Sequence, residues 1–315
     1  MYIGIDLGGM SIKAGLVNEN YEIVRTKTMP TGAERHGDEI AKDMARLARE
    51  LTEEAGLSLK EIKAVGVGCP GACNSKTGIC AFSANINFND THICEIIQNE
   101  LGVPAYLGND ANVAAYGEYK VIGEKMESLF FVTLGTGVGG GIILDGKIYD
   151  GFNGVAAEIG HIQVNKDSEI KCGCGRYGCW ETEASVSALI RETKKAIEQN
   201  PDCAMAKAVE GDLSRVNGRT SFDAAKAGDA VAQKVVDAYI KAVGEGVASM
   251  INIFQPEVLL IGGAISKEGD YLLDPIRKLA ETETYKHNGV HTRIAAAKLG
   301  NDAGIIGAAL LGEQN

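Results

Sequence analysis

The stretch "YIGIDLGGMSIKAGLVNENYEIV" at residues 2–24 decides the fold. It reads as an apolar strand, a glycine turn, a second apolar strand, a polar turn and a third short strand. The stretch "LFFVTLGTGVGGGIILDGKIY" at residues 129–149 follows the same plan. We therefore predict two hairpin units of related structure, one at the start of each half of the chain.

Two further pairs of segments repeat in the same order. "IKAVGVGCPG" (62–71) and "PEVLLIGGAIS" (256–266) each read as a buried strand that ends at glycines. "LGNDANVAAYGE" (107–118) and "LGNDAGIIGAALLGE" (299–313) each place Gly-Asn-Asp-Ala between a strand and an alanine-rich helix. Three repeats in one order predict a duplicated α/β unit.

Helical patterns lie between these strands. Apolar residues recur at helical spacing from Ile40 to Leu51, a helix is expected near residues 185–200, and residues 229–254 are predicted to form one long buried helix. The second copy is longer than the first. A cysteine-rich stretch and the helix near residues 185–200 account for most of the excess, so they are interpreted as an insertion.

Composition limits the classes of function. The chain has 315 residues, of which 45% are hydrophobic and 40 are glycine, and its net charge is −11. This charge argues against nucleic acid and anionic membranes as partners, because both are bound through basic surfaces. No apolar run is long enough to span a membrane and no signal peptide is evident, so we expect a cytoplasmic protein. Closely spaced cysteines there indicate metal ligands more than disulfides.

The two glycine-tipped hairpins predict a polyphosphate site. Neither has the strand, G-x-G-x-x-G and helix order of a Rossmann fold, and no Walker motif is present. Glycines let backbone N–H groups approach phosphates, so an acidic protein could hold ATP in this way. Asp6 could hold Mg²⁺ through water, and Thr136 could offer its hydroxyl to phosphate. The alternative is that Asp6 caps a turn and the glycines serve only tight hairpins.

A short segment after the second hairpin predicts a zinc site. His161, Cys172, Cys174 and Cys179 have the spacing H-x10-C-x-C-x4-C. Three thiolates and one imidazole form a closed tetrahedral Zn²⁺ site, which is structural because no coordination position is left for chemistry. The alternative is a loop of surface thiols with a packed histidine.

The other sulfur and aromatic residues receive a simpler interpretation. Cys69, Cys73, Cys80, Cys94 and Cys203 lack such spacing and are interpreted as small apolar core residues. Trp180 is interpreted as a packing residue.

Two acidic residues flank the predicted zinc ligands. A metal ion that draws the ends of the segment together would present Glu158, Glu181 and one face of His161 to one cleft. Paired hydrogen-bond acceptors of this kind suit sugar hydroxyls.

The motifs quoted above, together with "EIGH" and "CGCGRYGCWE", resemble the ROK family of sugar kinases, within the hexokinase, actin and Hsp70-like ATPase superfamily. "EIGH" followed by C-x-C-G-x-x-G-C-x-E is the most specific of them. It is similar to the branch that contains glucokinases and N-acetylmannosamine kinases.

The resemblance implies an α/β fold of two ribonuclease-H-like (actin-like ATPase) lobes with a central cleft and a zinc-binding insertion in the second lobe. The implied small lobe comprises residues 1–118 and 301–315 with a returning C-terminal helix. The implied large lobe comprises residues 119–300. A homodimer or homotetramer is also implied.

The resemblance further implies ATP-dependent phosphorylation of the 6-hydroxyl of glucose, with Mg²⁺ as catalytic cofactor. Asp110 matches the catalytic base, which the residues alone could not distinguish from Asp302. The implied sugar contacts are Gly71, Asn85, Asn109, Asp110, Glu158, His161 and Glu181. The implied nucleotide contacts are Asp6, Gly8, Gly9, Lys13, Thr136, Gly137, Gly262 and Gly263.

The chain departs from the family pattern at two places, and alternatives stay open. Met10 stands where members usually have Thr, so one hydroxyl contact to phosphate is either missing or supplied by Ser11, and Ala264 replaces a glycine of the adenosine loop. Asp110 could instead be only the N-cap of a helix. N-acetylmannosamine is the second candidate substrate, ahead of fructose, and a non-catalytic sugar sensor is a further reading. A repressor is disfavoured because the first expected strand begins at Tyr2, which leaves no room for a winged helix-turn-helix.

Overall fold

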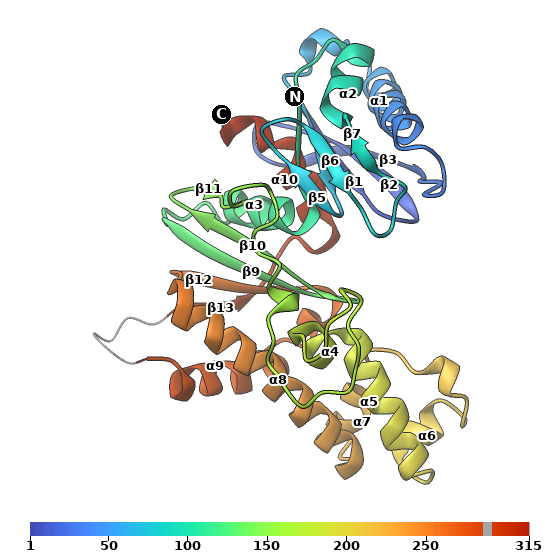
Figure 1. The fold of residues 1–315 in the computed structure, drawn as a ribbon, viewed down its shortest axis with the longest axis vertical. Coiled ribbons are helices and arrows are strands. Elements are labelled where there is room, and N and C mark those ends of the chain that lie inside the picture. The colour runs from blue at the N-terminus through green and yellow to red at the C-terminus, as the bar shows by residue number, and fades with distance from the viewer. Residues whose placement is uncertain (286–291, 315) are drawn as a thin grey trace. The chain divides into compact units, whose positions relative to one another are not determined.

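The computed structural model of the protein describes residues 1–285 and 292–314. The chain folds into a mixed α/β structure of strands and helices, as Figure 1 shows. The predicted fold class is confirmed. No helix among the described residues is both long and apolar enough to cross a membrane.

The first half forms a five-stranded sheet in the order β3-β2-β1-β4-β8. Neighbouring strands are antiparallel across β1, β2 and β3 and parallel across β1, β4 and β8. The strands are β1 (Tyr2–Leu7), β2 (Ser11–Val17), β3 (Ile23–Pro30), β4 (Val65–Cys69) and β8 (Ala105–Asn109). The hairpin predicted from residues 2–24 is therefore confirmed.

The second half repeats this order in a second five-stranded sheet, β11-β10-β9-β12-β13. Its strands are β9 (Ser128–Leu134), β10 (Val138–Leu144), β11 (Lys147–Ile148), β12 (Val258–Gly262) and β13 (Arg293–Ala296). The matching strand orders confirm the duplication that the sequence repeats predicted. A third, smaller sheet contains β5 (Ala72–Asn74), β6 (Ile79–Phe82) and β7 (Asn89–Thr91).

The α-helices lie between and after these strands. They are α1 (Gly37–Glu54), α2 (Ile93–Leu101), α3 (Asp110–Ile122), α4 (Trp180–Ala184), α5 (Val186–Gln199), α6 (Ala204–Ala208), α7 (Thr220–Lys226), α8 (Ala230–Phe254), α9 (Asp270–Glu283) and α10 (Ala303–Ala309). The helices predicted around residues 40–51 and 185–200 are thus present as α1 and α5.

Helix α8 corrects one expectation. Asp229 caps it through hydrogen bonds from the N–H groups of Val231 and Ala232, at 2.9 and 2.8 Å. It is one continuous helix, as predicted, but it is not buried all round, since Ile253 is 66% exposed. Its buried residues contact α4, α5, α7 and α9, which are grouped around it in Figure 1. The apolar run in the sequence therefore reflects the packing of one part of the α8 surface against several other helices.

The described chain packs into two compact units. The first unit contains Met1–Phe131, Gly141–Ala157 and Lys298–Asn315, and the second unit contains Val132–Gly140 and Glu158–Ala297. The lobe boundaries expected at residues 118 and 300 stay a prediction. Residues 286–291 and 315, which those lobes include, lie outside the described residues.

Helix α10 packs against the first unit through glycines. A Cβ atom added at Gly4 of β1 would lie 1.8 Å from the carbonyl oxygen of Ile305, and one at Gly66 of β4 would lie 1.8 Å from that of Ala308. A Cβ atom at Gly307 would lie 1.8 Å from the carbonyl oxygen of Val113 in α3. The backbone of α10 therefore lies directly on two strands and one helix, at a distance that a side chain would prevent.

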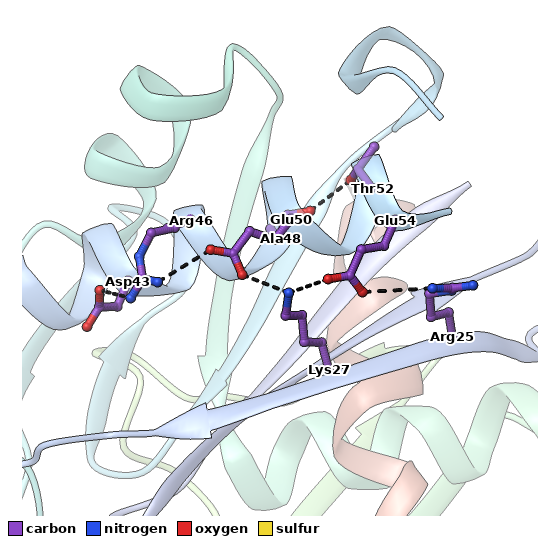
Figure 2. Close-up of polar contacts among 8 residues, drawn as sticks. All are labelled: Arg25, Lys27, Asp43, Arg46, Ala48, Glu50, Thr52 and Glu54. Carbon is purple, nitrogen blue, oxygen red and sulfur yellow. Dashed lines mark hydrogen bonds and ion pairs between the residues drawn. The ribbon is translucent and has the colours of Figure 1, made fainter. Parts of the chain in front are cut away.

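Charged residues protect the outer edge of the first sheet. The edge strand β3 is mostly exposed, and its residues Arg25 and Lys27 reach Glu50 and Glu54 on α1. Figure 2 shows these pairs continuing along α1 through Arg46. Such exposed pairs contribute little to stability, but charges on an edge strand oppose pairing with another chain.

Candidate functional site

Asp6 and Lys13 lie opposite each other in the first hairpin. They are partners in the β1–β2 register, so their side chains point to the same face of the sheet. Burial raises the pKa of Asp6, Lys13 lowers it, and the nearby carboxylate of Asp110 raises it again. The structure thus brings the proposed magnesium-associated and catalytic carboxylates close enough to influence each other within the first unit.

The first glycine turn is held by backbone and side-chain hydrogen bonds. The N–H of Gly8 donates to the carbonyl oxygen of Ser11 at 2.9 Å, and the hydroxyl of Thr31 donates to the carbonyl oxygen of Gly8 at 2.6 Å. Met10 at the tip is 90% exposed. Thr31 was not predicted, because nothing in its sequence neighbourhood indicates that β3 ends beside this turn.

Asn109 and Asp110 join β8 to α3. Asn109, not Asp110, is the N-cap: its side-chain oxygen accepts from the N–H groups of Ala111 at 3.0 Å and Asn112 at 3.3 Å. The reading of Asp110 as a mere N-cap is therefore wrong. Asp110 is the first helical residue, where the positive end of the helix dipole favours an anion.

Asp110 is exposed to solvent but surrounded by protein atoms on its inner side. The resulting loss of hydration raises its pKa, while hydrogen bonds from the N–H groups of Ala111 and Asp110 and from the side chain of Asn109 lower it in part. A carboxylate with a raised pKa accepts a proton more readily than an ordinary surface aspartate.

Gly71 and Asn85 complete the group in the first unit. The side-chain amide of Asn109 donates to the carbonyl oxygen of Gly71 at 3.4 Å. Gly71 has φ of 117°, and a Cβ there would lie 2.2 Å from the carbonyl oxygen of Phe82, so only glycine fits. Asn85 is exposed, and its backbone lies next to Gly9.

The second glycine turn lies in the second unit. The N–H of Gly135 donates to the carbonyl oxygen of Gly137 at 3.0 Å, which leaves Thr136 exposed at the tip. Glu181 accepts a hydrogen bond from the N–H of Val138 at 3.1 Å, and a Cβ at Gly137 would lie 2.3 Å from the same carboxylate oxygen. Glu181 therefore supports this turn, a contact that sequence reasoning missed.

Gly262 and Gly263 end β12 beside the same turn. Gly263 has φ of 88°, and a Cβ there would lie 2.1 Å from the carbonyl oxygen of Leu134 at the end of β9. The hydroxyl of Ser266 donates to the carbonyl oxygen of Gly263 at 2.8 Å. Two of the three glycine loops predicted to contact nucleotide, those at Thr136–Gly137 and Gly262–Gly263, are thus neighbours within the second unit.

The predicted zinc ligands come together. One ligand atom from each of His161, Cys172, Cys174 and Cys179 lies within 4.8 Å of the others. His161 Nδ1 is 3.5 Å from the sulfur of Cys172, and the sulfurs of Cys174 and Cys179 are 3.6 Å apart. Zn–S bonds of about 2.3 Å in a tetrahedron would separate sulfur atoms by about 3.8 Å, so the four residues fit a closed Zn²⁺ site.

The loop around these four residues is built from tight turns. Arg176 donates a hydrogen bond to the carbonyl oxygen of His161. A Cβ at Gly178, which has φ of 73°, would lie 1.8 Å from the carbonyl oxygen of Asn165. Trp180, which follows the last cysteine, is fully buried and donates to the carbonyl oxygen of Ala242 at 2.9 Å, so its packing role is confirmed.

The two acidic residues that flank this loop, Glu158 and Glu181, make different contacts. Nε2 of His161 lies 3.9 Å from a carboxylate oxygen of Glu158, on the ring edge opposite the nitrogen that faces Cys172. The second carboxylate oxygen of Glu181 lies 3.4 Å from the sulfur of Cys172. Glu181 thus connects the cysteine loop to the second glycine turn, whereas Glu158 and His161 form a pair that could contact a ligand.

The site residues therefore form two groups. The group in the first unit is Asp6, Gly8, Gly9, Lys13, Gly71, Asn85, Asn109 and Asp110. The group in the second unit is Thr136, Gly137, Glu158, His161, Glu181, Gly262, Gly263 and the three zinc-loop cysteines. That both groups serve one cleft stays a prediction.

Comparisons with known proteins give consistent results. The model of the ROK family matches residues 2–315. A glucokinase from Streptomyces coelicolor is 38% identical over 99% of this chain and 97% of its own length. An N-acetylmannosamine kinase from Salmonella typhi is 28% identical over 99% of this chain and 98% of its own. The crystal structure of a ROK family glucokinase from Streptomyces griseus, in complex with glucose and AMPPNP, is 35% identical with a TM-score of 0.83 and covers 100% of this chain and 99% of that one.

Proposed function

This chain belongs to the ROK family, and on that premise we propose that it is a glucokinase that transfers a phosphoryl group from ATP to the 6-hydroxyl of glucose. The observation that carries the proposal is the full-length similarity to glucokinases, one of which binds glucose and an ATP analogue in its crystal structure. The site residues agree with this activity, because each motif that the reaction needs is present.

Asp110 orients the sugar hydroxyl and accepts its proton. A carboxylate is too weak a base to remove an alcohol proton in advance, so the transfer occurs late, as the phosphoryl group leaves ATP. The raised pKa of Asp110 assists, and Asn109 holds the helix start in place through its cap. Alignment contributes more than basicity in phosphoryl transfer.

The backbone of the two glycine turns binds the phosphates of ATP. In this role Gly8, Gly9 and Gly137 expose N–H groups, Thr136 adds a hydroxyl and Lys13 adds a positive charge. Asp6 would hold Mg²⁺ when the ion is bound. The ion supplies charge neutralisation for the phosphates.

The cysteine loop binds structural Zn²⁺ through His161, Cys172, Cys174 and Cys179. The ion supplies a fixed fold for the loop. Because Nδ1 faces the cysteines, the opposite Nε2 edge of His161 contacts sugar hydroxyls, and the carboxylate of Glu158 beside it contributes to the same contact. Glu181 supports the turn at Gly137 and contacts the sugar from its remaining acceptor positions.

N-acetylmannosamine is the second candidate substrate, since a kinase for that sugar is also similar over the full length. A non-catalytic sensor is the third reading, and the presence of Asp110 with both glycine turns argues against it. Location in the cytoplasm and assembly as a homodimer or homotetramer stay predictions.

A coupled ADP-release assay separates these candidates. Glucose, N-acetylmannosamine, N-acetylglucosamine, mannose and fructose are compared at matched concentrations, with about one zinc per chain checked by elemental analysis. We expect glucose to give the highest kcat/KM. A higher value for N-acetylmannosamine would support the second candidate, and no ADP release with any sugar would support the sensor. A fully active metal-free preparation would contradict the zinc assignment.

A further inference from the structure

Three cysteines that the sequence analysis did not connect lie close together near the junction of β8 and α3, at Asn109 and Asp110. Cys69 ends β4, Cys73 lies on β5 and Cys80 lies on β6, where Cys73 and Cys80 are register partners. Their three sulfur atoms lie within 4.8 Å of one another, and those of Cys69 and Cys80 are 3.8 Å apart. The interpretation of these residues as separate core positions is therefore incomplete: they are buried, but they form a cluster.

The cluster is made of sulfur alone. Cys69, Cys73 and Cys80 are 0%, 2% and 0% exposed, and the group holds no histidine or carboxylate among the described residues. Their hydrogen bonds to backbone carbonyls, at 3.4–3.6 Å, are weak ones for thiols. Soft ions prefer such a donor set, whereas Mg²⁺ and Ca²⁺ require oxygen ligands.

The spacing fits a three-coordinate centre. Bonds of about 2.3 Å to one central atom, at angles of about 95–120°, separate sulfurs by about 3.4–4.0 Å. The 3.8 Å between Cys69 and Cys80 already falls in this range, and small χ1 rotations of Cys73 would close the remaining distances. Zn²⁺ would need a water molecule as its fourth ligand, because the cluster contains three ligand residues, and three thiolates around it would carry a net charge of −1.

Charge restricts the ligand further. The hydrogen bond with Cys69 lowers the pKa of Cys73, but the hydrogen bond with Cys80, burial and the nearby carboxylate of Asp110 raise it more. Three thiolates around monovalent copper would carry a net charge of −2 next to this carboxylate, in a buried place where charge is costly. A neutral complex avoids that cost.

We propose that Cys69, Cys73 and Cys80 form a binding site for trivalent arsenic, taken up as arsenous acid. Three As–S bonds form, three As–O bonds break, and each thiol proton leaves with a hydroxyl group as water, so that As(OH)₃ and three thiols give a neutral tris-thiolate and three waters. No oxidant or reductant is needed. Hydrogen bonds from Cys69 and Cys73 lower the pKa of Cys80, which favours the thiolate form of its sulfur.

A cavity provides a route to the cluster. It has a volume of about 270 Å³, lies within the first unit and is lined by Cys73, Ser75, Asn109 and Asn112 among others. Arsenous acid is small and uncharged, so it can enter a cavity of this size without losing strong ionic hydration.

Arsenic bound at this site would restrain the junction of β8 and α3. Cys69 is the register partner of Asn109, and the carbonyl oxygen of Gly71, which accepts from Asn109, lies between Cys69 and Cys73 in the chain. Three As–S bonds would tie the ends of β4, β5 and β6 together around this turn. We therefore expect arsenite to lower turnover more than it changes ATP affinity.

The experiment measures arsenic bound to the zinc-loaded, full-length enzyme. Wild type and the single variants Cys73→Ser, Cys80→Ser and Cys94→Ser are incubated with sodium arsenite and freed of excess, and arsenic, zinc and free thiols are counted. We expect one arsenic per wild-type chain, three protected thiols and retained zinc. Arsenic affinity should fall at least about tenfold in Cys73→Ser and Cys80→Ser, because even outer-shell changes reach that size.

Cys94→Ser is the matched control, since Cys94 is also buried in the first unit but lies outside the cluster. It should bind arsenic as wild type does. Arsenite should also raise the Tm of wild type and not that of Cys80→Ser, because a ligand stabilises only the state that binds it. Equal arsenic binding by all variants, or release of one zinc for each arsenic bound, would overturn the proposal, the latter by placing the arsenic at the zinc loop.

Discussion

The two Leu-Gly-Asn-Asp-Ala segments have the same sequence and different structures. In the first, β8 runs directly into Asn109, whose side chain caps α3 and leaves the carboxylate of Asp110 exposed at the helix start. In the second, Gly300 has φ of 55°, residues 300–302 form a 3₁₀ turn, and Asp302 makes no capping hydrogen bond. The comparison teaches that context, not the motif, determines how each aspartate is placed in the structure.

The difference arises from the residues before each motif. β8 ends at Asn109 itself, whereas β13 ends at Ala296, so residues 297–299 intervene. The N–H groups of Lys298 and Leu299 donate to the buried carboxylate of Glu118, at 2.9 and 2.7 Å, and Glu118 belongs to the helix that the first motif begins. Within the first unit, the helix of the first motif thus fixes the residues at the start of the second motif.

The largest expected effect comes from exchanging each aspartate for asparagine. Asp110→Asn should fold and bind glucose but lose kcat by about 10²–10⁴-fold, the usual contribution of a general base. Asp302→Asn should retain kcat within about twofold, as is typical away from a site. Steady-state kinetics and glucose titration calorimetry measure both. An equal loss in the two variants would remove the functional distinction between the motifs.

The next effect concerns the hydrogen bonds that connect Glu118 to the start of the second motif. Glu118→Ala should lower the free energy of unfolding by about 3 kcal/mol, because two backbone N–H groups lose a charged acceptor in a buried place. Glu118→Gln keeps one acceptor oxygen and should lose less. Urea denaturation measures both variants. If Glu118→Ala were as stable as wild type, the hydrogen bonds from Lys298 and Leu299 to Glu118 would not stabilise the fold.

The N-cap effect is smaller. Asn109→Ala should cost about 1 kcal/mol of stability, while Asn109→Asp, which restores a capping oxygen, should cost less. Asn301→Ala should change stability by no more than about 0.5 kcal/mol, since it lies in a 3₁₀ turn where no capping bond is formed. Thermal denaturation compares the three. A greater loss at Asn301 would show that the second motif also depends on a cap.

The smallest effect is a pH dependence of stability. Because the pKa of Asp110 is raised on folding, its ionised form is disfavoured in the native state, and this penalty is present above the folded pKa and absent below the unfolded one. Asp110→Asn should therefore be at least as stable as wild type at pH 7. The advantage should shrink as pH falls through the folded pKa. Denaturant titrations between pH 7 and pH 4 measure the difference, and an advantage that grows toward acid would reverse the sign.

Sequence patterns were sufficient for the two hairpin units, for helices α1, α5 and α8, and for the duplication, whereas the small sheet of β5, β6 and β7 and the short helices α6 and α7 were not predicted. The glycine hairpins, the strands at residues 65–69 and 258–262, and the cap-to-cap extent of α8 could be predicted because each depends on local pattern. The zinc ligands could be predicted for the same reason, since Cys172, Cys174 and Cys179 are close in sequence.

Contacts between distant segments could not be predicted in this way. The cluster of Cys69, Cys73 and Cys80 depends on the register of β5 and β6, and the hydrogen bond from the N–H of Val138 to Glu181 joins residues 43 positions apart. Spacing in sequence carries no information about such pairs. The same limit explains why the motif itself could not distinguish Asp110 from Asp302.

The close packing of α10 on glycines of the first sheet has a consequence for biosynthesis. Residues 303–309 press their backbone onto Gly4 and Gly66, yet a ribosome makes them some 240 residues after β4. Part of the apolar surface of the amino-terminal sheet must therefore stay uncovered until residues 303–309 have been translated. Chaperones that shield nascent chains should find their longest-lasting target here.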